Sequence, residues 1–246
     1  MKFFALMSFL AVFAMNQATV SAQELTFATL NWEPYIGQKL EDEGFVAEIV
    51  RAAFQRSGYD KVTFLFYPWA RTLKASQAGL VDGYLPEYYA SSIEAHHLFS
   101  APFPGGPLVF LKLKAKDIPY HSLPDLKPYK IGVVRGYVNT REFDMADFLN
   151  KEEVANDLQN LKKLLAGRVD LIVIDKYVGD HLLDTRLPGR KQNTDFLDPP
   201  LGVNDLYVCF SKKKNYAETL RNDFNAGLRQ IREDGTLMQI MNKKGF

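Results

Sequence analysis

The sequence is nearly free of cysteine, because only Cys209 among its 246 residues carries a thiol. A single cysteine excludes an internal disulfide, and a chain of this length can bury an adequate core without one. Cys209 lies in the strand-like run 206–211. We therefore expect a buried hydrophobic residue there rather than a reactive thiol.

The sequence also lacks an excess of either charge. Its 30 lysines and arginines are balanced by 29 aspartates and glutamates, which leaves a formal net charge of +1. Nucleic acids and anionic membranes attract proteins with a basic excess, so neither is expected as the main partner. After residue 22 no apolar run reaches the ~20 residues that a membrane-spanning helix needs.

Motifs that would support catalysis or metal binding are scarce. No glycine-rich phosphate loop is present, and the histidines fall in no metal-ligand spacing: His96, His97, His121 and His181. The adjacent pair 96–97 would point in different directions on a helix or a strand. With no nucleophile–base pair in view, we expect a binding protein rather than an enzyme, without a cofactor or a metal.

The first 22 residues show the pattern of a secretory signal. Lys2 is followed by an apolar run over 3–15, interrupted only by Ser8, and then by the small residues Ser21 and Ala22. Cleavage after Ala22 would remove 22 of 246 residues and leave 224. The pattern predicts export to the periplasm; an uncleaved anchor or a buried helix is the alternative.

The rest of the chain alternates short strands with helices, in two similar units over about 23–110 and 115–203. This order predicts an α/β fold with mostly parallel sheets. In the first unit we expect strands at 24–30, 62–66 and 80–84, and helices at 44–57 and 69–78. In the second we expect strands at 130–134 and 171–174, and helices that begin near 140 and run over 156–166 and 176–183.

Two extended segments, 107–113 and 205–211, lie where the chain passes between the two units. The amphipathic segment 216–241, broken at Gly235, should return to the first unit. The sequence thus predicts two lobes, 23–110 with 206–246 and 111–205, joined by a two-strand hinge. One continuous domain, or two domains on a single linker, is the alternative; the absence of a flexible Gly/Ser linker favours the hinge.

Several short motifs occur in an order that resembles a known family, the bacterial extracellular solute-binding proteins of the polar amino acid type (family 3). The matching stretches are 32–35 (WEPY), 44–50 (GFVAEIV), 67–71 (YPWAR), 79–83 (GLVDG), 99–103 (FSAPF), 131–137 (IGVVRGY), 167–175 (GRVDLIVID) and 233–240 (EDGTLMQI). The resemblance implies the two-lobed type II periplasmic-binding fold and capture of a small polar ligand, such as an amino acid, for an ABC-type transporter permease.

The resemblance is also compatible with roles other than delivery to a transporter. A relative of this kind can instead report its ligand to a membrane sensor. A dehydratase or lyase on the same fold, with Glu33 or Glu87 as a general acid, is a further alternative. We expect the protein to act as a monomer.

Ligands of open α/β sheets bind beyond the carboxyl ends of the strands, and candidate residues follow three strands of the first unit. The rings of Trp32 and Tyr35 would hold an apolar or cationic ligand group, and Trp69 would contact the ligand, with a position in the core as its alternative. Arg71 offers a fork of donors for a carboxylate. Glu87, in a loop with Leu85, Pro86 and Tyr88, would pair with an ammonium group. The alternatives are packing at the rim for Trp32 and Tyr35, a surface ion pair for Arg71, and a solvated side chain for Glu87.

In the second unit, the turn that contains Arg135, Gly136 and Tyr137 leads into a helix and is a candidate anion site. An ordinary strand-to-helix turn is the alternative. The resemblance implies that Asp175 receives the amino group of the ligand. Asp175 would otherwise cap the helix that begins at Lys176.

One position departs from the family pattern. The arginine that binds the ligand carboxylate in the family lies shortly before the Phe-Ser pair, and counting back from Ser100 places Ile93 there. The usual carboxylate clamp is therefore absent, which argues against a standard α-amino acid as the ligand unless Arg71 or Arg135 takes its place.

Overall fold

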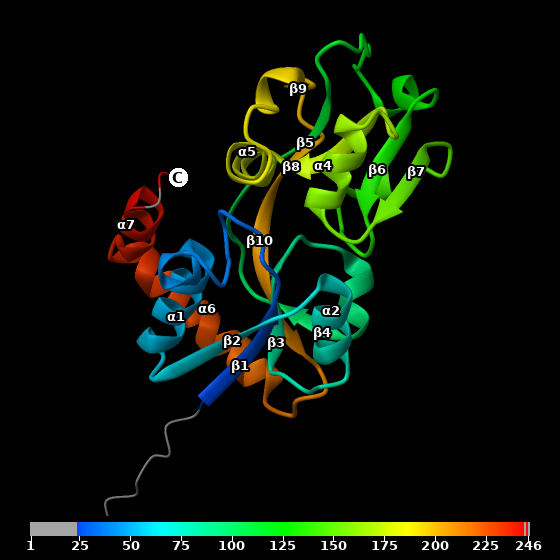
Figure 1. Cartoon of the computed structure of the whole chain (residues 1–246). Helices are drawn as coiled ribbons and strands as arrows, with labels where there is room; N and C mark the ends of the chain where they lie inside the picture. The colour runs from blue at the N-terminus through cyan, green and yellow to red at the C-terminus, as the bar shows by residue number, and fades with distance from the viewer. Residues whose placement is uncertain (1–23, 244, 246) are drawn as a thin grey trace, which may run out of the picture.

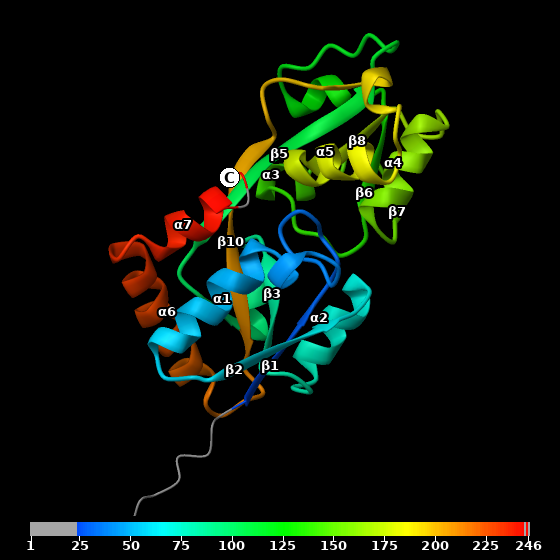
Figure 2. The same cartoon turned by 60° about the vertical axis from the view of Figure 1, so that its left-hand side comes forward.

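The fold is described by a computed structural model in which residues 24–243 and 245 are placed. The predicted secretory signal, residues 1–22, lies outside the described residues. Figures 1 and 2 show two lobes, and two long strands run between them. The predicted α/β architecture is confirmed.

The first lobe is built on the N-terminal part of the chain and closed by the C-terminal helices (Figure 1). Its strands β1 and β2 pair in parallel from Glu24–Lys61 to Thr29–Phe66, and β1 also pairs in parallel with β3. The elements are β1 (Glu24–Thr29), α1 (Phe45–Arg56), β2 (Lys61–Phe66), α2 (Trp69–Gln77), β3 (Gly83–Glu87), β4 (His97–Phe99), α6 (Ala217–Glu233) and α7 (Thr236–Lys243), with 3-10 turns at Glu41–Glu43 and Ser91–Ala95.

The second lobe repeats this arrangement of parallel strands. Strand β6 lies between β7 and β8 and is parallel to both. The elements are β6 (Lys130–Val134), α3 (Arg141–Asp144), β7 (Asn150–Val154), α4 (Asp157–Leu165), β8 (Leu171–Asp175), α5 (Lys176–Thr185) and β9 (Thr194–Phe196), with 3-10 turns at Leu123–Leu126 and Lys191–Asn193.

The strands β5 (Phe103–Leu113) and β10 (Gly202–Ser211) connect the lobes. They pair with each other in antiparallel fashion between 103–108 and 202–206. Beyond that stretch β5 pairs with β8 of the second lobe, whereas β10 pairs with β3 and β4 of the first. Each long strand therefore belongs to both lobes, as the predicted two-strand hinge requires.

The core of the first lobe explains why its helices form where they do. The buried face of α1 carries Phe45, Ile49 and Phe54 at helical spacing, and it packs against α6. Cys209 is fully buried in β10, as expected for a small hydrophobic residue. No helix in the described part of the chain is long and apolar enough to cross a membrane.

The third strand is displaced from its expected position at 80–84, because β3 runs from Gly83 to Glu87. Leu80 is 77% exposed in the preceding turn, and the side chain of Asp82 anchors that turn by accepting hydrogen bonds from Thr26 N (2.7 Å) and Tyr216 Oη (2.8 Å). A proline inside a strand usually marks a sheet edge or an irregularity. Here the register of the partner strand β10 shifts between Tyr207 and Cys209, beside Pro86.

Candidate functional site

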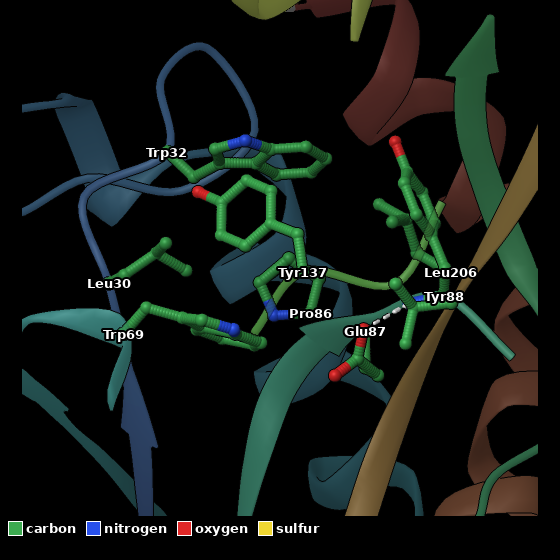
Figure 3. A pocket seen from close by; sticks show the side chains of 9 residues that line it. Leu30, Trp32, Trp69, Pro86, Glu87, Tyr88, Tyr137 and Leu206 are labelled. Atoms are coloured by element: carbon green, nitrogen blue, oxygen red, sulfur yellow. Dashed lines mark hydrogen bonds between the residues drawn. The ribbon is translucent and has the colours of Figure 1, made fainter. Parts of the chain in front are cut away.

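A small cavity of about 290 Å³ lies between the two lobes, beside the connecting strands (Figure 3). Its walls come from the loop after β1, the start of α2, the end of β3, the turn after β6, and β10. The lining residues are Leu30, Trp32, Trp69, Pro86, Glu87, Tyr88, Tyr137, Val138 and Leu206. A wider hollow shares Leu30, Trp32, Trp69 and Tyr137 with this cavity and extends it toward α4 and α5.

The aromatic loop after β1 forms one wall. Trp32 lines the cavity and stacks on Tyr35, with ring centroids 4.5 Å apart and an interplanar angle of 17°. Tyr88 meets Trp32 edge-on at 6.0 Å. Tyr35 is fully buried beneath Trp32 and does not line the cavity. Of the two rings expected here from the sequence, Trp32 alone faces the space where a ligand would lie.

The opposite wall contains Trp69, whose indole forms a hydrogen bond between the two lobes. Trp69 Nε1 donates a hydrogen bond to the carbonyl oxygen of Gly136 at 2.9 Å, and the Trp69 ring meets the Tyr137 ring edge-on at 5.6 Å. Gly136 has a φ of +78°, a conformation that favours glycine and turns its carbonyl oxygen toward the first lobe. Both Trp69 and Tyr137 therefore line the cavity while contacting each other across the cleft.

Glu87 brings a buried carboxyl group to the cavity floor. It belongs to β3 rather than to the expected loop, and it is 5% exposed. Its Oε2 accepts a hydrogen bond from Tyr84 Oη at 3.0 Å and its Oε1 accepts one from the backbone N–H of Tyr88 at 2.9 Å. Burial raises the pKa of Glu87 to about 8, although these two hydrogen bonds favour the charged form.

A second buried carboxyl group, Asp157, comes from the first turn of α4 and lines the wider hollow. Its Oδ2 accepts a hydrogen bond from Tyr137 Oη at 3.0 Å. Burial raises the pKa of Asp157 to about 7, and the nearby charge of Asp175 acts in the same direction. Trp32 Nε1 lies near this carboxylate but is a buried donor without a hydrogen bond of normal geometry.

Asp175 ties the two lobes together instead of facing the cavity. Its Oδ1 accepts hydrogen bonds from the backbone N–H groups of Tyr177 (2.9 Å) and Val178 (3.2 Å) and so caps α5, as one of the two sequence-based alternatives predicted. Its Oδ2 accepts hydrogen bonds from Tyr35 Oη (2.9 Å) and Tyr88 Oη (3.1 Å) of the first lobe. Burial raises the pKa of Asp175 to about 6. Four donors already satisfy this carboxylate.

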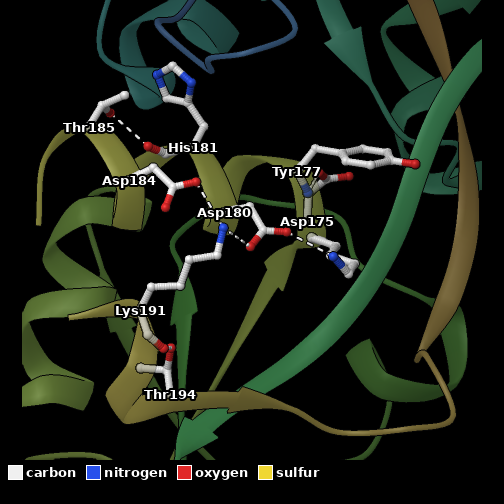
Figure 4. A network of polar contacts seen from close by, with 9 residues as sticks. Asp175, Tyr177, Asp180, His181, Asp184, Thr185, Lys191 and Thr194 are labelled. Carbon is white, nitrogen blue, oxygen red and sulfur yellow. Dashed lines mark hydrogen bonds and ion pairs between the residues drawn. The ribbon is translucent and has the colours of Figure 1, made fainter. Parts of the chain in front are cut away.

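The exposed side of α5 contributes a further contact between the lobes (Figure 4). His181 points away from α5 toward the loop after β1, where its Nε2 lies 3.3 Å from Glu33 Oε2. Below it, Lys191 Nζ pairs with Asp180 and Asp184, each at 2.8 Å, which fixes the end of the helix. The cleft is thus bridged on its open side as well as at its base.

Two arginines expected at the site lie away from it. The exposed Arg71 stacks its guanidinium over the ring of Tyr67 at 4.2 Å, and the exposed Arg135 pairs with Glu153 at 2.7 Å. Neither residue lines the cavity or the wider hollow. The sequence-based placement of a carboxylate clamp at Arg71 or Arg135 is therefore not supported by this geometry.

The expected anion site at the turn after β6 is partly occupied by the protein itself. Helix α3 has only four residues, and its N-cap Thr140 accepts a hydrogen bond from the Phe143 N–H. The carboxylate of Asp144 accepts hydrogen bonds from the backbone and the side-chain nitrogen of Asn139. The donors of Asn139 and Phe143 are thus occupied, and the turn places Tyr137 in the cavity.

Ile93, at the position of the family arginine, lines a third hollow behind Glu87. Its other lining residues include His96 and His97 but no lysine or arginine. His97 is buried and its Nε2 lies 2.9 Å from Ser76 Oγ, whereas His96 is exposed, so the two rings point apart as expected. Within the described residues, no group of three or more His, Cys, Asp or Glu side chains has the arrangement of a metal site.

Comparison with known proteins decides the family. The model of the bacterial extracellular solute-binding proteins, family 3, matches residues 25–244. The chain belongs to this family. No curated protein matches it in sequence.

Solved structures show that this solute-binding protein has the type II periplasmic-binding fold. A histidine kinase sensor domain with similarity to periplasmic binding proteins aligns with a TM-score of 0.78 at 18% identity, over 91% of this chain and 96% of that one. The substrate-binding protein of an amino acid ABC transporter gives 0.72 at 19%, over 91% and 99%. An amino acid ABC transporter substrate-binding protein from Streptococcus pneumoniae, bound to L-arginine, gives 0.73 at 17%, over 90% and 94%.

Sequence reasoning missed part of the cavity of this solute-binding protein. Asp157 follows the helix cap Asn156, and an acidic residue in the first helical turn carries no signal of its own because it is common there. Tyr88 was placed in a loop, but its buried hydroxyl joins the lobes. Leu206 lies in an extended run. The pairing of β10 with β5 determines which side of this run faces the cavity, and the sequence alone does not show that pairing.

Proposed function

We propose that this protein is an exported, monomeric solute-binding protein that holds a small polar ligand between its lobes and delivers it to the permease of an ABC-type transporter. The observation that carries the proposal is the cavity of about 290 Å³, which is walled by both lobes and lies beside the two strands that connect them. The cavity is small, which favours a small ligand.

Closure of the lobes is the proposed mechanism of capture. We place the lobe boundaries near residues 110 and 205, so that β5 and β10 form the hinge. The proposed ligand-binding residues are Trp32, Trp69, Glu87, Tyr88, Tyr137 and Asp157. A ligand that contacts both walls stabilises the closed state by the difference between its affinities for the closed and open states. The transporter would then recognise the closed form.

A sensor role is the second candidate, and the alignment with a histidine kinase sensor domain favours it. Such a role uses the same cavity and differs in the membrane protein that the closed form contacts. A dehydratase or lyase would instead convert the bound compound, and the family and its structural neighbours consist of binding proteins. The candidates therefore differ in what happens to the ligand after capture.

A thermal-shift screen of residues 23–246 against amino acids, organic acids and amines tests the proposal. We expect one class of compound to raise the melting temperature and to be recovered unchanged. Trp69→Ala should abolish that shift, whereas Arg71→Ala, beside the cavity but outside it, should leave it intact. A shift that survives Trp69→Ala would place the ligand elsewhere, and conversion of the compound would indicate an enzyme.

Deletion of the gene distinguishes the two binding roles once a ligand is known. Loss of uptake of the radiolabelled ligand supports delivery to a transporter. Unchanged uptake combined with loss of a transcriptional response to the ligand supports the sensor role instead.

A further inference from the structure

We propose that the ligand is a small organic cation without a carboxylate group, and that Glu87 and Asp157 bind its positively charged ends. The inference rests on the proposed binding function and names the ligand class for the same cavity. It follows from three features of the cleft: its buried carboxylates, its aromatic walls and the position of its basic residues.

The two carboxyl groups lack a cationic partner among the described residues. Glu87 is 5% exposed and Asp157 is 7% exposed, and their hydrogen-bond donors are tyrosine hydroxyls and a backbone N–H. Neither pairs with a described basic residue, whereas the acids Glu33 and Asp82 pair with His181 and Lys214. Burying a carboxylate costs several kcal/mol unless it is paired, so each group gains most from a ligand that brings a positive charge.

The carboxyl groups meet the ligand space at different points. Glu87 lines the small cavity and Asp157 lines the wider hollow that shares Tyr137 with it. In Figure 3 the hydroxyl of Tyr137, which donates to Asp157, lies beside Trp32, whereas Glu87 lies on the other side of the cavity near Pro86. A ligand with a positive group at each end fits this placement better than a ligand with a single charge.

The walls between these carboxyl groups are suited to a cation. Trp32, Trp69, Tyr88 and Tyr137 all line the cavity, and aromatic faces attract ammonium and guanidinium groups.

Basic side chains that could bind a carboxylate are missing from the described lining of the small cavity. No lysine or arginine lines the small cavity in the described structure, and Ile93 replaces the family arginine. Lys39 and Arg186 line the wider hollow, but both are exposed, so solvent screens their charges more strongly than those of the buried acids. A ligand carboxylate would therefore meet two buried acids without a buried basic partner.

Matched pairs of compounds test this inference, because an amine and its parent amino acid differ by one carboxylate. Isothermal titration calorimetry would compare agmatine with L-arginine, cadaverine with L-lysine, and putrescine with L-ornithine. We expect one of the amines to bind at least tenfold more tightly than its parent amino acid. Equal or tighter binding of the amino acid in every pair would overturn the inference.

Isosteric variants identify the groups responsible. Glu87→Gln and Asp157→Asn keep the size and one acceptor oxygen of each side chain and remove its charge, so each should weaken amine binding at least tenfold. The control Glu94→Gln neutralises an exposed glutamate outside the cleft and should leave affinity unchanged. Amine binding that is insensitive to both cleft variants would overturn the assignment.

The same experiment separates this inference from the proposed function. Saturable binding of an amino acid or an organic acid that disappears in Trp69→Ala would preserve the binding function and overturn the cationic ligand class. If none of the screened compounds binds in the cavity, both proposals fail.

Discussion

At the scale of single residues, the cleft buries the acidic groups of Glu87 and Asp157, although aspartate and glutamate are rarely buried in proteins unless they are paired. Glu87 has a pKa of about 8 in the fold, against an ordinary value near 4.5, because burial disfavours its charged form. The titratable groups that interact with it are Tyr84, Tyr88, Tyr137, Asp144 and Cys209. Without a ligand, the folded protein therefore holds a proton on Glu87 at pH 7 that the unfolded chain releases.

This difference predicts how stability changes with pH. Above pH 4.5 the unfolded chain binds fewer protons at this site than the folded one, so the free energy of unfolding falls as the pH rises toward 8. Glu87→Gln removes the effect. Between pH 6.5 and 8, urea denaturation of the ligand-free protein should show the variant gaining about 1–2 kcal/mol relative to the wild type.

His97 changes stability in the opposite direction, but it is present in both proteins and cancels in the comparison. Burial lowers the pKa of His97 from 6.5 to about 4, so His97 favours the folded state above pH 6.5 and reduces its stability below that value. Asp157 acts in the same direction as Glu87, but it is present in both proteins and cancels in the comparison. A stability difference that stays constant with pH would show that Glu87 ionises normally in the fold.

The sequence indicated some of these residues but not their relations. Trp32, Trp69, Glu87 and Tyr137 were predicted because each follows a strand end, and all four line the cavity. The sequence did not show in which direction each side chain points. Arg71 lies close to Trp69 in the chain, yet helix α2 turns its side chain outward onto Tyr67.

At the scale of elements, periodicity predicted the long helices and the buried strands well. The strand expected at 130–134 matches β6, and the helix expected at 156–166 matches α4 with Asn156 as its cap. The short strand β7 was missed because its sequence, NKEEV, has too few apolar residues to show alternation. Pairing with β6 stabilises it, and that pairing is a property of the sheet rather than of the segment.

Close packing of α1 against α6 provides a test at this scale. A Cβ atom placed on Gly227 of α6 would lie 1.8 Å from the backbone carbonyl oxygen of Ala53 in α1. Alanine normally stabilises a helix by about 1 kcal/mol relative to glycine. Here we expect Gly227→Ala to lower the free energy of unfolding by about 1–3 kcal/mol, because the helices must separate to admit the methyl group.

Chemical denaturation measures this change, and Ala226→Gly in the same helix serves as the control. The control removes a methyl group beside Gly227 and should cost about 1 kcal/mol through helix propensity alone. If Gly227→Ala stabilised the protein, the close contact between α1 and α6 would be wrong.

At the scale of the whole molecule, the lobes are held together by hydrogen bonds that need no ligand. Asp175 of the second lobe accepts hydrogen bonds from Tyr35 and Tyr88 of the first, and Trp69 donates to Gly136 across the cleft. These contacts compete with open states of the hinge. The affinity for a ligand then depends on the fraction of molecules that are already closed as well as on contacts in the cavity.

Removing both tyrosine hydroxyls tests this coupling. The double variant Tyr35→Phe, Tyr88→Phe keeps the rings and leaves the Asp175 carboxylate buried with only its two helix-capping donors. We expect it to destabilise the closed state by about 3 kcal/mol, because hydrogen bonds to a charged group are worth about 1.5–3 kcal/mol each. Small-angle scattering of the ligand-free variant should show a larger radius of gyration than that of the wild type, and saturating ligand should restore the compact value.

Tyr59→Phe is the matched control, because the Tyr59 hydroxyl donates to Asp223 within the first lobe at 2.6 Å. Its loss changes a hydrogen bond of similar chemistry without touching the cleft, so the radius of gyration should stay at the wild-type value. If the double variant scattered like the wild type and bound ligand equally well, the Asp175 contacts would not hold the lobes together, and closure would depend on the hinge strands, Trp69 and the contact between His181 and Glu33.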